Sequence, residues 1–207
     1  MSLKVLIRNA AVGVLMFGGV AAATQANLIT NGTFDTDLSG WTINVLSGTS
    51  GVTFDNGTAH VGRPGTPGTV QFNQGFKLPT TSTAVEIAFD YQWQINKPQQ
   101  TDFFSVFFGY FQLGNGFVSS VLVGESSEVA DFGNTISFKS TVLVSDVDFS
   151  GGFNNAQIDF FLQETNPSAG TRVQLDNVSV NVVPAPATLA LIGLGLAGLG
   201  WSRRKSA

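Results

Sequence analysis

The sequence contains no cysteine and only one histidine, His60. Without cysteine the chain forms no disulfide and has no thiol nucleophile, and one histidine without thiolates falls short of an ordinary zinc site. A Ser-His-Asp arrangement would have to use His60, and the sequence has no Gly-x-Ser-x-Gly turn. His60 lies in a short apolar run, where a lone histidine is most often structural. These absences argue against thiol, zinc and serine-hydrolase catalysis.

Charge is also scarce, at 12% of residues, and it is unevenly placed. All fourteen acidic residues lie between Asp35 and Asp176. Half of the ten basic residues lie near the ends of the chain: Lys4, Arg8, Arg203, Arg204 and Lys205. The body between the ends therefore carries five cations against fourteen carboxylates, a net charge of −9. Nucleic-acid binding needs a basic surface, so we expect no nucleic-acid partner.

The same balance fits a soluble extracellular protein, or one that binds cations. It fits an anionic polysaccharide only if a divalent metal bridges the two.

The N-terminus has the layout of a secretory signal peptide. Lys4 and Arg8 precede an apolar stretch at residues 10–23, and the small residues that follow offer cleavage after Ala23 or after Ala26. We prefer Ala26, because Asn27 begins the first strand-like run, and we predict a signal helix within residues 1–26. The expected partners are the Sec translocon and signal peptidase. A retained N-terminal anchor is the alternative.

The C-terminus combines a proline hinge, an apolar run and a basic end. Residues 184–186 are Pro-Ala-Pro, and residues 187–201 carry no charge. Three cations follow: Arg203, Arg204 and Lys205. As a helix the apolar run would span roughly 22 Å, whereas a bilayer core takes about 20 residues. The transmembrane helix predicted at 187–201 is thus short, and it is either a simple anchor or a transient one that is cut.

This C-terminal pattern closely resembles a PEP-CTERM sorting signal over residues 183–207. Pro184-Ala185-Pro186 stands where the family signature reads Pro-Glu-Pro, and the apolar run and Arg203-Arg204-Lys205 follow. The resemblance implies recognition by an exosortase, a membrane protease of Gram-negative bacteria that make exopolysaccharide. It also implies a route: secretion through the inner membrane, a transient membrane anchor, then the cell envelope surface or the extracellular matrix.

Between the two ends the apolar runs are short, rich in Val, Ile, Phe and Thr, and separated by Gly, Asn, Pro or Ser. This punctuation predicts strands. We expect them at 41–46, 52–54, 58–61, 69–77, 84–95, 102–111, 117–123, 136–144, 157–163 and 172–183. Short strands without a helical segment predict an all-β fold, an antiparallel β-sandwich of jelly-roll type, in one domain over residues 27–182.

The run at residues 103–111 is apolar on both faces. Two interpretations follow. It is either a fully buried central strand or an aromatic strip used for binding.

The ends of the body resemble jelly-roll carbohydrate-binding modules. Residues 27–35, Asn-Leu-Ile-Thr-Asn-Gly-Thr-Phe-Asp, followed by Gly40-Trp41, are similar to the opening of these modules. Residues 173–180 are similar to their last strand. The resemblance implies that the first and last strands pair.

It also implies a structural calcium ion near the junction of these two segments. On that basis Asp35 and Asp176 are the expected ligands, with Asp37 a weaker third, because calcium takes carboxylate and carbonyl oxygens. The alternative is that Asp35 and Asp37 form a polar turn and Asp176 bonds to the backbone.

The sequence does not assign a glycan site. Sugars are bound by exposed aromatic rings with amides nearby, and the large candidates are Trp41, Tyr91, Trp93 and Tyr110. Tyr91 and Trp93 share an apolar face, which favours the core, and Trp41 resembles a core position. An amide cluster could line a groove or form a soluble loop: Gln92, Gln94, Asn96, Gln99 and Gln100.

A glycosidase needs only two facing carboxylates, and four glutamates could supply them: Glu86, Glu125, Glu128 and Glu164. No compact acidic motif is present, so we predict a non-catalytic protein. Its expected work is structural or adhesive, in association with exopolysaccharide. The alternatives are a carbohydrate-binding module with a specific glycan ligand, and a glycosidase that modifies polysaccharide.

Overall fold

The computed structural model describes residues 26–63, 65, 67–94, 102–126, 132–150, 155–165 and 171–183. They form ten strands, each overlapping one predicted run: β1 (Thr42–Gly48), β2 (Val52–Asp55), β3 (Thr58–Val61), β4 (Gly68–Phe76), β5 (Ala84–Gln94), β6 (Phe103–Gln112), β7 (Gly116–Ser126), β8 (Ile136–Leu143), β9 (Ala156–Glu164) and β10 (Arg172–Val182). The predicted all-β class is confirmed. The predicted signal helix and C-terminal transmembrane helix lie outside the described residues. Within those residues we find no helix able to cross a membrane.

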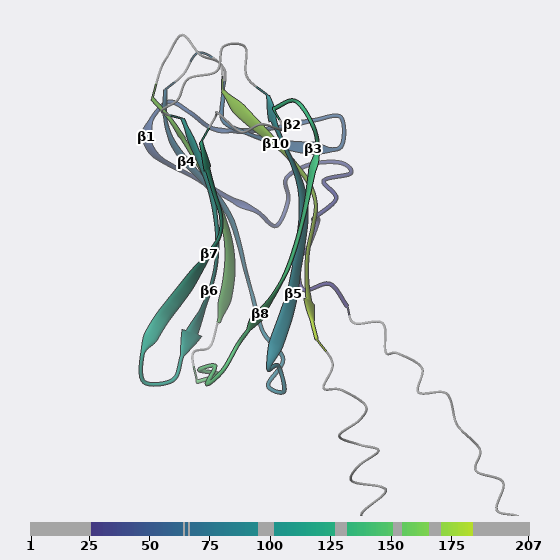
Figure 1. Ribbon diagram of the computed structural model, residues 1–207, viewed down its shortest axis with the longest axis vertical. Helices are drawn as coiled ribbons and strands as arrows, with labels where there is room; N and C mark the ends of the chain where they lie inside the picture. Colours follow the sequence, from purple (N-terminus) through teal and green to yellow (C-terminus); the bar gives the residue numbers. More distant parts are fainter. Residues whose placement is uncertain are drawn as a thin grey trace, which may run out of the picture.

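The strands form two antiparallel five-stranded sheets that pack face to face (Figure 1). Sheet A has the order β1-β4-β9-β6-β7, and sheet B has the order β2-β3-β10-β5-β8. We call the end of the sandwich where β6 and β10 begin the upper end. The lower end is where β6 and β10 finish and the chain leaves the sandwich (Figure 1).

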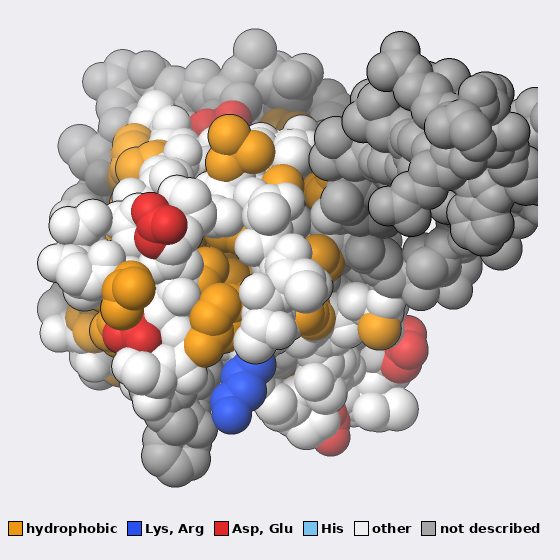
Figure 2. Space-filling view, turned by 90° about the horizontal axis from the view of Figure 1, so that it is seen from below, with side chains coloured by type: hydrophobic (Ala, Val, Ile, Leu, Met, Phe, Trp, Pro, Cys, Tyr) orange, Lys and Arg blue, Asp and Glu red, His pale blue; other side chains and the backbone are white. Residues whose placement is uncertain are grey.

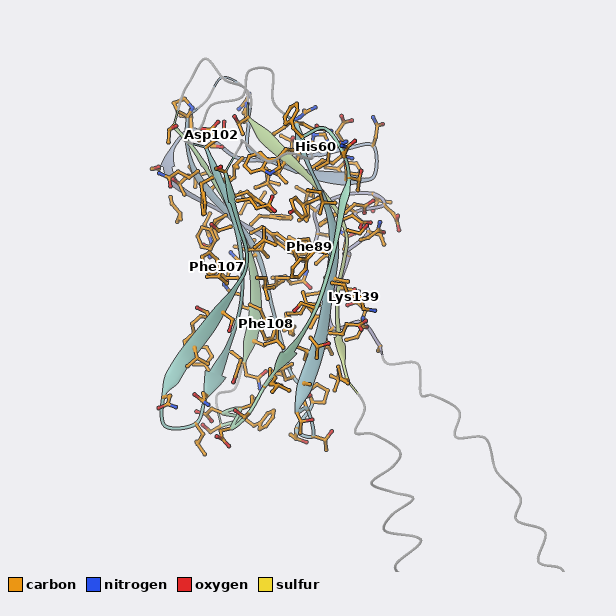
Figure 3. The ribbon with its side chains drawn as sticks, viewed as in Figure 1. His60, Phe89, Asp102, Phe107, Phe108 and Lys139 are labelled. Atoms are coloured by element: carbon orange, nitrogen blue, oxygen red, sulfur yellow. The ribbon has the colours of Figure 1, made fainter. Side chains whose placement is uncertain are left out.

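Alternation along the strands fills the space between the sheets with aromatic rings. In Figure 3, Phe108 of sheet A and Phe89 of sheet B point into this space, whereas Phe107 points out of sheet A. Phe89 meets Phe160 of β9 edge to face, with ring centroids 5.3 Å apart. Trp93 and Tyr91 are only 1% and 3% exposed, which confirms their assignment to the core. Such packed rings account for much of the stability that a domain without disulfides needs.

The opening segment corrects one expectation. Residues 28–33 form a series of bends rather than a strand, and the first strand begins at Thr42 and pairs with β4. The segment nevertheless docks on β10, because the Leu28 amide donates to the Val180 carbonyl at 2.8 Å and the Val178 amide donates to the Gly32 carbonyl at 2.9 Å. Contact is so close that a Cβ at Gly32 would lie 2.0 Å from the Val178 carbonyl oxygen.

Candidate functional site

The outer surface of sheet A carries a row of phenylalanines from three strands. Strand β6 turns Phe104, Val106 and Phe108 into the core and Phe103, Phe107 and Phe111 outward, so neither interpretation of this run holds alone. Five rings make up what we call the aromatic face: Phe103, Phe107, Phe111, Phe117 and Phe161. Three of them are strongly exposed, Phe103 at 42% and both Phe111 and Phe117 at 46%.

The rings are fixed by contacts with one another. Phe107 meets Phe161 edge to face at 5.5 Å, and Phe111 meets Phe117 at 5.3 Å with an interplanar angle of 63°. Phe117 lies over Gly109, since a Cβ at Gly109 would come within 2.3 Å of its ring. The glycine thus leaves room for the ring to lie close to the sheet.

Beside these rings runs a chain of amides. Asn44 donates to Gln71 at 3.0 Å, and Gln71 in turn donates to the Asp159 carboxylate at 2.6 Å. Gln157 donates to the same carboxylate oxygen at 2.6 Å. Asp159 is only 5% exposed, and burial raises its pKa while the two amides act in the opposite direction. The surface therefore combines apolar rings with oriented amides, which is the chemistry that binds sugar rings and their hydroxyls.

The aromatic residues named from the sequence lie elsewhere. Trp41 stacks on Phe72 at 4.6 Å, and its indole donates to the Asn31 carbonyl at 3.0 Å. Tyr110 points to the lower end, where its hydroxyl accepts a hydrogen bond from the Ser145 amide at 3.3 Å. With Trp93 and Tyr91 buried, none of the four belongs to the aromatic face.

The amide cluster is only partly described. Gln94 accepts from Arg172 Nε at 2.8 Å and donates to Gln92 at 3.1 Å and to Gln174, so this part forms a network on the outer surface of sheet B. Asn96, Gln99 and Gln100 lie outside the described residues. Below the network is a pocket of about 190 Å³, lined by Asp90, Tyr91, Gln92, Thr135, Gln174, Asp176 and Asn177.

Asp176, a predicted calcium ligand, lies in this pocket. It stands directly opposite Asp90 in the register of β10 and β5, just before a bulge at which Asn177 takes a φ of 53°. Burial raises the pKa of Asp176, and the charges of Asp90 and Asp35 raise it further, which places Asp35 in its neighbourhood as the terminal resemblance implies. Like charges directly opposite one another destabilise a strand pair.

The other contacts also suit the alternative of a polar turn. Asp35 accepts from the Thr33 hydroxyl at 2.9 Å, and the Asp37 carboxylate accepts from the Ser39 amide at 2.9 Å. Among the described residues no group of three or more acidic or histidine side chains is arranged to hold a metal. A calcium ion here would need backbone carbonyls as well, which commonly supply its ligands. Calcium therefore stays a prediction.

Two further carboxylates are buried at the upper end of the sandwich. Asp102, labelled in Figure 3, is fully buried and accepts hydrogen bonds from the Thr165 amide at 2.8 Å and from the Thr171 hydroxyl. Glu164 accepts from the Ser50 hydroxyl at 2.6 Å and the Arg63 amide at 3.1 Å. Burial raises the pKa of Glu164 to about 7, despite those hydrogen bonds, and the charge of Asp102 adds to the rise.

The remaining candidates for catalysis are engaged in structural contacts. Glu86 forms an ion pair with Lys139 at 2.9 Å, Glu125 accepts from the Trp93 indole at 3.5 Å, and Glu128 lies outside the described residues. His60 is 4% exposed in β3, with its Nε2 2.9 Å from the Thr58 hydroxyl, and burial lowers its pKa. A neutral, buried imidazole fits the structural role expected for it.

Comparison with known families identifies the C-terminus. A family model described as the PEP-CTERM protein-sorting motif matches residues 182–205. The chain ends in a PEP-CTERM sorting motif. The match agrees with the expected tag at 183–207, and it includes Pro184, Ala185, Pro186, Arg203, Arg204 and Lys205, which lie outside the described residues. The motif implies sorting by an exosortase to the cell surface.

Solved structures share the fold of the body. The N-terminal cellulose-binding domain of β-1,4-glucanase C from Cellulomonas fimi aligns over 77% of this chain and 99% of its own, with a TM-score of 0.50 and 15% identity. The enzymatically active domain of bacteriophage CBA120 tailspike protein 4 aligns over 76% of this chain, with a TM-score of 0.51 and 15% identity. An arabinose-bound α-L-arabinofuranosidase aligns over 76%, with a TM-score of 0.50 and 12% identity.

These likenesses establish a jelly-roll sandwich of the kind found in carbohydrate-binding modules. The chain spans only 21% of the tailspike structure and 26% of the arabinofuranosidase structure. No curated protein matches the sequence.

Proposed function

We propose that the protein is an exosortase-sorted component of the cell surface or extracellular matrix, and that its body is a non-catalytic adhesive domain that holds exopolysaccharide on the aromatic face. The sorting motif supplies the address. The observation that carries the adhesive role is the aromatic face itself, where Phe103, Phe111 and Phe117 remain exposed beside an ordered row of amides.

Large apolar side chains left in water on a folded surface commonly mark binding sites. Of the three carboxylates in the strands of sheet A, Glu125 and Glu164 share the inward parity of their strands and Asp159 is covered by its amides. The aromatic face is therefore close to uncharged, although the body has a net charge of −9. Such a surface suits a neutral polysaccharide chain that stacks on the rings.

The non-catalytic part of the proposal rests on the state of the acidic groups. Asp102 and Glu164 accept hydrogen bonds from threonine, serine and backbone groups, and both are shielded from solvent. A glycosidase instead needs two carboxyls facing each other across an open substrate site.

The test is glycan binding by residues 27–183, measured on an array and by affinity electrophoresis in the exopolysaccharide of the producing cell. Phe111→Ala combined with Phe117→Ala should weaken binding at least about tenfold, equivalent to about 1.4 kcal/mol, with little loss of stability because both rings are exposed. Leu143→Ala, which removes an even more exposed apolar side chain from sheet B, is the control and should bind like the wild type.

Three outcomes distinguish the alternatives. Broad binding to polysaccharide that depends on Phe111 and Phe117 supports the adhesive role. Tight binding to a single oligosaccharide would favour a dedicated carbohydrate-binding module. Shortened glycan products would overturn the non-catalytic assignment.

A further inference from the structure

The chain leaves the sandwich at the lower end, immediately beside the sorting tag. The Val183 amide still donates to the Ala84 carbonyl at 2.9 Å, so the folded body extends to the last residue before Pro184. Only residues 184–186 separate this point from the charge-free run at 187–201. Three residues reach at most about 10 Å. A tag held in a membrane would therefore hold the lower end of the sandwich at the membrane surface.

That end carries large apolar side chains that are strongly exposed. The two most exposed large apolar side chains in the described part of the protein both lie there, Leu143 at 77% where β8 ends and Leu113 at 67% on the β6–β7 turn. Phe149 adds a third, at 41% exposure. The segment 145–148 joins them, since the Leu113 amide donates to the Asp146 carbonyl at 2.6 Å. Figure 2, which views this end directly, shows apolar side chains across its centre, with acidic side chains toward the rim and a basic side chain beside them.

The short apolar run of the tag favours contact between this end of the body and the membrane. As a helix, its 15 apolar residues would cover roughly 22 Å, less than the hydrocarbon core of about 30 Å. A short span is accommodated by local thinning and by flanking groups that enter the interface. Apolar side chains on the adjoining face of the body would lower that cost, whereas a polar face would raise it.

We propose that, while the tag anchors the precursor, the lower end of the sandwich docks on the outer surface of the lipid bilayer, with Leu113, Leu143 and Phe149 in the headgroup layer. This inference rests on the proposed sorting by an exosortase and on the transient membrane anchor predicted from the sequence. Asp146 lies exposed and Asp148 half-buried at the same end, so docking should be stronger on zwitterionic than on anionic lipid.

The absence of cysteine makes the test direct, because one introduced thiol gives one labelled site. Asn115→Cys places a fluorophore on the β6–β7 turn, and Gly51→Cys places the control label at the upper end, where a Cβ meets nothing within 4 Å. The chain from Asn27 to Ala207 is reconstituted in phosphatidylcholine vesicles that carry a headgroup quencher. We expect at least threefold stronger quenching at position 115 than at position 51.

Leu113→Ser combined with Leu143→Ser should reduce the quenching at position 115 at least twofold, while vesicle flotation stays unchanged. Equal quenching at both positions in a chain that floats would overturn docking and leave the anchor standing. A chain that does not float would overturn the anchor and docking together. Replacing phosphatidylcholine with phosphatidylglycerol should reduce the quenching at position 115, and an increase would contradict a contact made by apolar side chains beside carboxylates.

Discussion

At the scale of single residues, the role of each buried carboxylate follows from the groups that surround it. Glu164 and Asp102 are buried and are held by hydroxyl and amide donors. A carboxylate taken out of water in this way favours its protonated form. Glu164 therefore makes the stability of the body depend on pH near neutrality.

The sign of that dependence can be stated for Glu164. Its pKa in the folded state is about 7, against 4.5 in the unfolded chain, so the folded protein binds the extra proton between these values. The contribution of Glu164 to stability is full below pH 4.5, falls as pH rises, and has decreased by roughly 3 kcal/mol once pH passes the folded pKa. Urea unfolding of residues 27–183 at pH 5 and pH 8 measures the loss.

Glu164→Gln should abolish most of this decrease, because glutamine keeps an acceptor for Ser50 and Arg63 but does not titrate. The buried His60 acts in the opposite direction, since its lowered pKa makes stability rise with pH toward 6.5, and it acts equally in both proteins. An identical pH profile for wild type and variant would contradict the burial of Glu164.

A second prediction at this scale concerns the effect of replacing Asp176 on thermal stability, which should differ between metal-free and calcium-containing buffer. Without metal, Asp176→Asn should raise the melting temperature, because it removes the repulsion from Asp90 and Asp35. With millimolar calcium the wild type should gain stability and the variant should not. Thermal melts with calcium and with chelator test both parts, and Asp55→Asn should leave any calcium effect intact. A wild type that melts identically in both buffers would remove the calcium ion from the account.

At the scale of elements, the opening segment acts as a clasp on β10 although it is not a strand. Gly32 permits the close approach, so Gly32→Ala drives a methyl group against the Val178 carbonyl. We expect a loss of about 1–3 kcal/mol in unfolding free energy, as for other overpacked sites. Gly51→Ala, whose methyl meets nothing, should change stability by less than about 0.5 kcal/mol. Equal stability in both variants would show that the clasp is not tight.

The strands were the part of the structure that could best be predicted from the sequence. All the strands and the single sandwich follow from short β-branched and aromatic runs between glycine, asparagine and proline. The division of β6 between core and surface did not follow, because period-two alternation cannot be read when both sets of positions are phenylalanine. Gly109 was the one signal of an outward ring, because its lack of a side chain leaves room for the Phe117 ring to lie over the sheet.

The candidate site was less accessible, because it depends on which strands become neighbours. Gln71, Asp159 and Asn44 are far apart in sequence and meet only through the order β1-β4-β9. Local patterns do not carry that order. The sorting tag could be predicted from the sequence for the opposite reason, since its proline hinge, apolar run and cations are contiguous.

At the scale of the whole molecule, the two surfaces and the tag suggest one arrangement. The aromatic face lies on the outer surface of sheet A, and Val183, the residue before the tag, lies at the lower end of the sandwich. A body docked by that end would present the aromatic face to the surrounding matrix. The same body, once cut from its tag, would keep the face and lose the anchor.

The central claim is that the C-terminal tag directs sorting and is then removed. Intact-mass spectrometry of the protein recovered from the cell surface and matrix tests it most directly. We predict a polypeptide that begins at Asn27 and ends at or before residues 184–186, allowing for any group attached at the cut. A surface protein whose mass still includes residues 187–207 would contradict the claim.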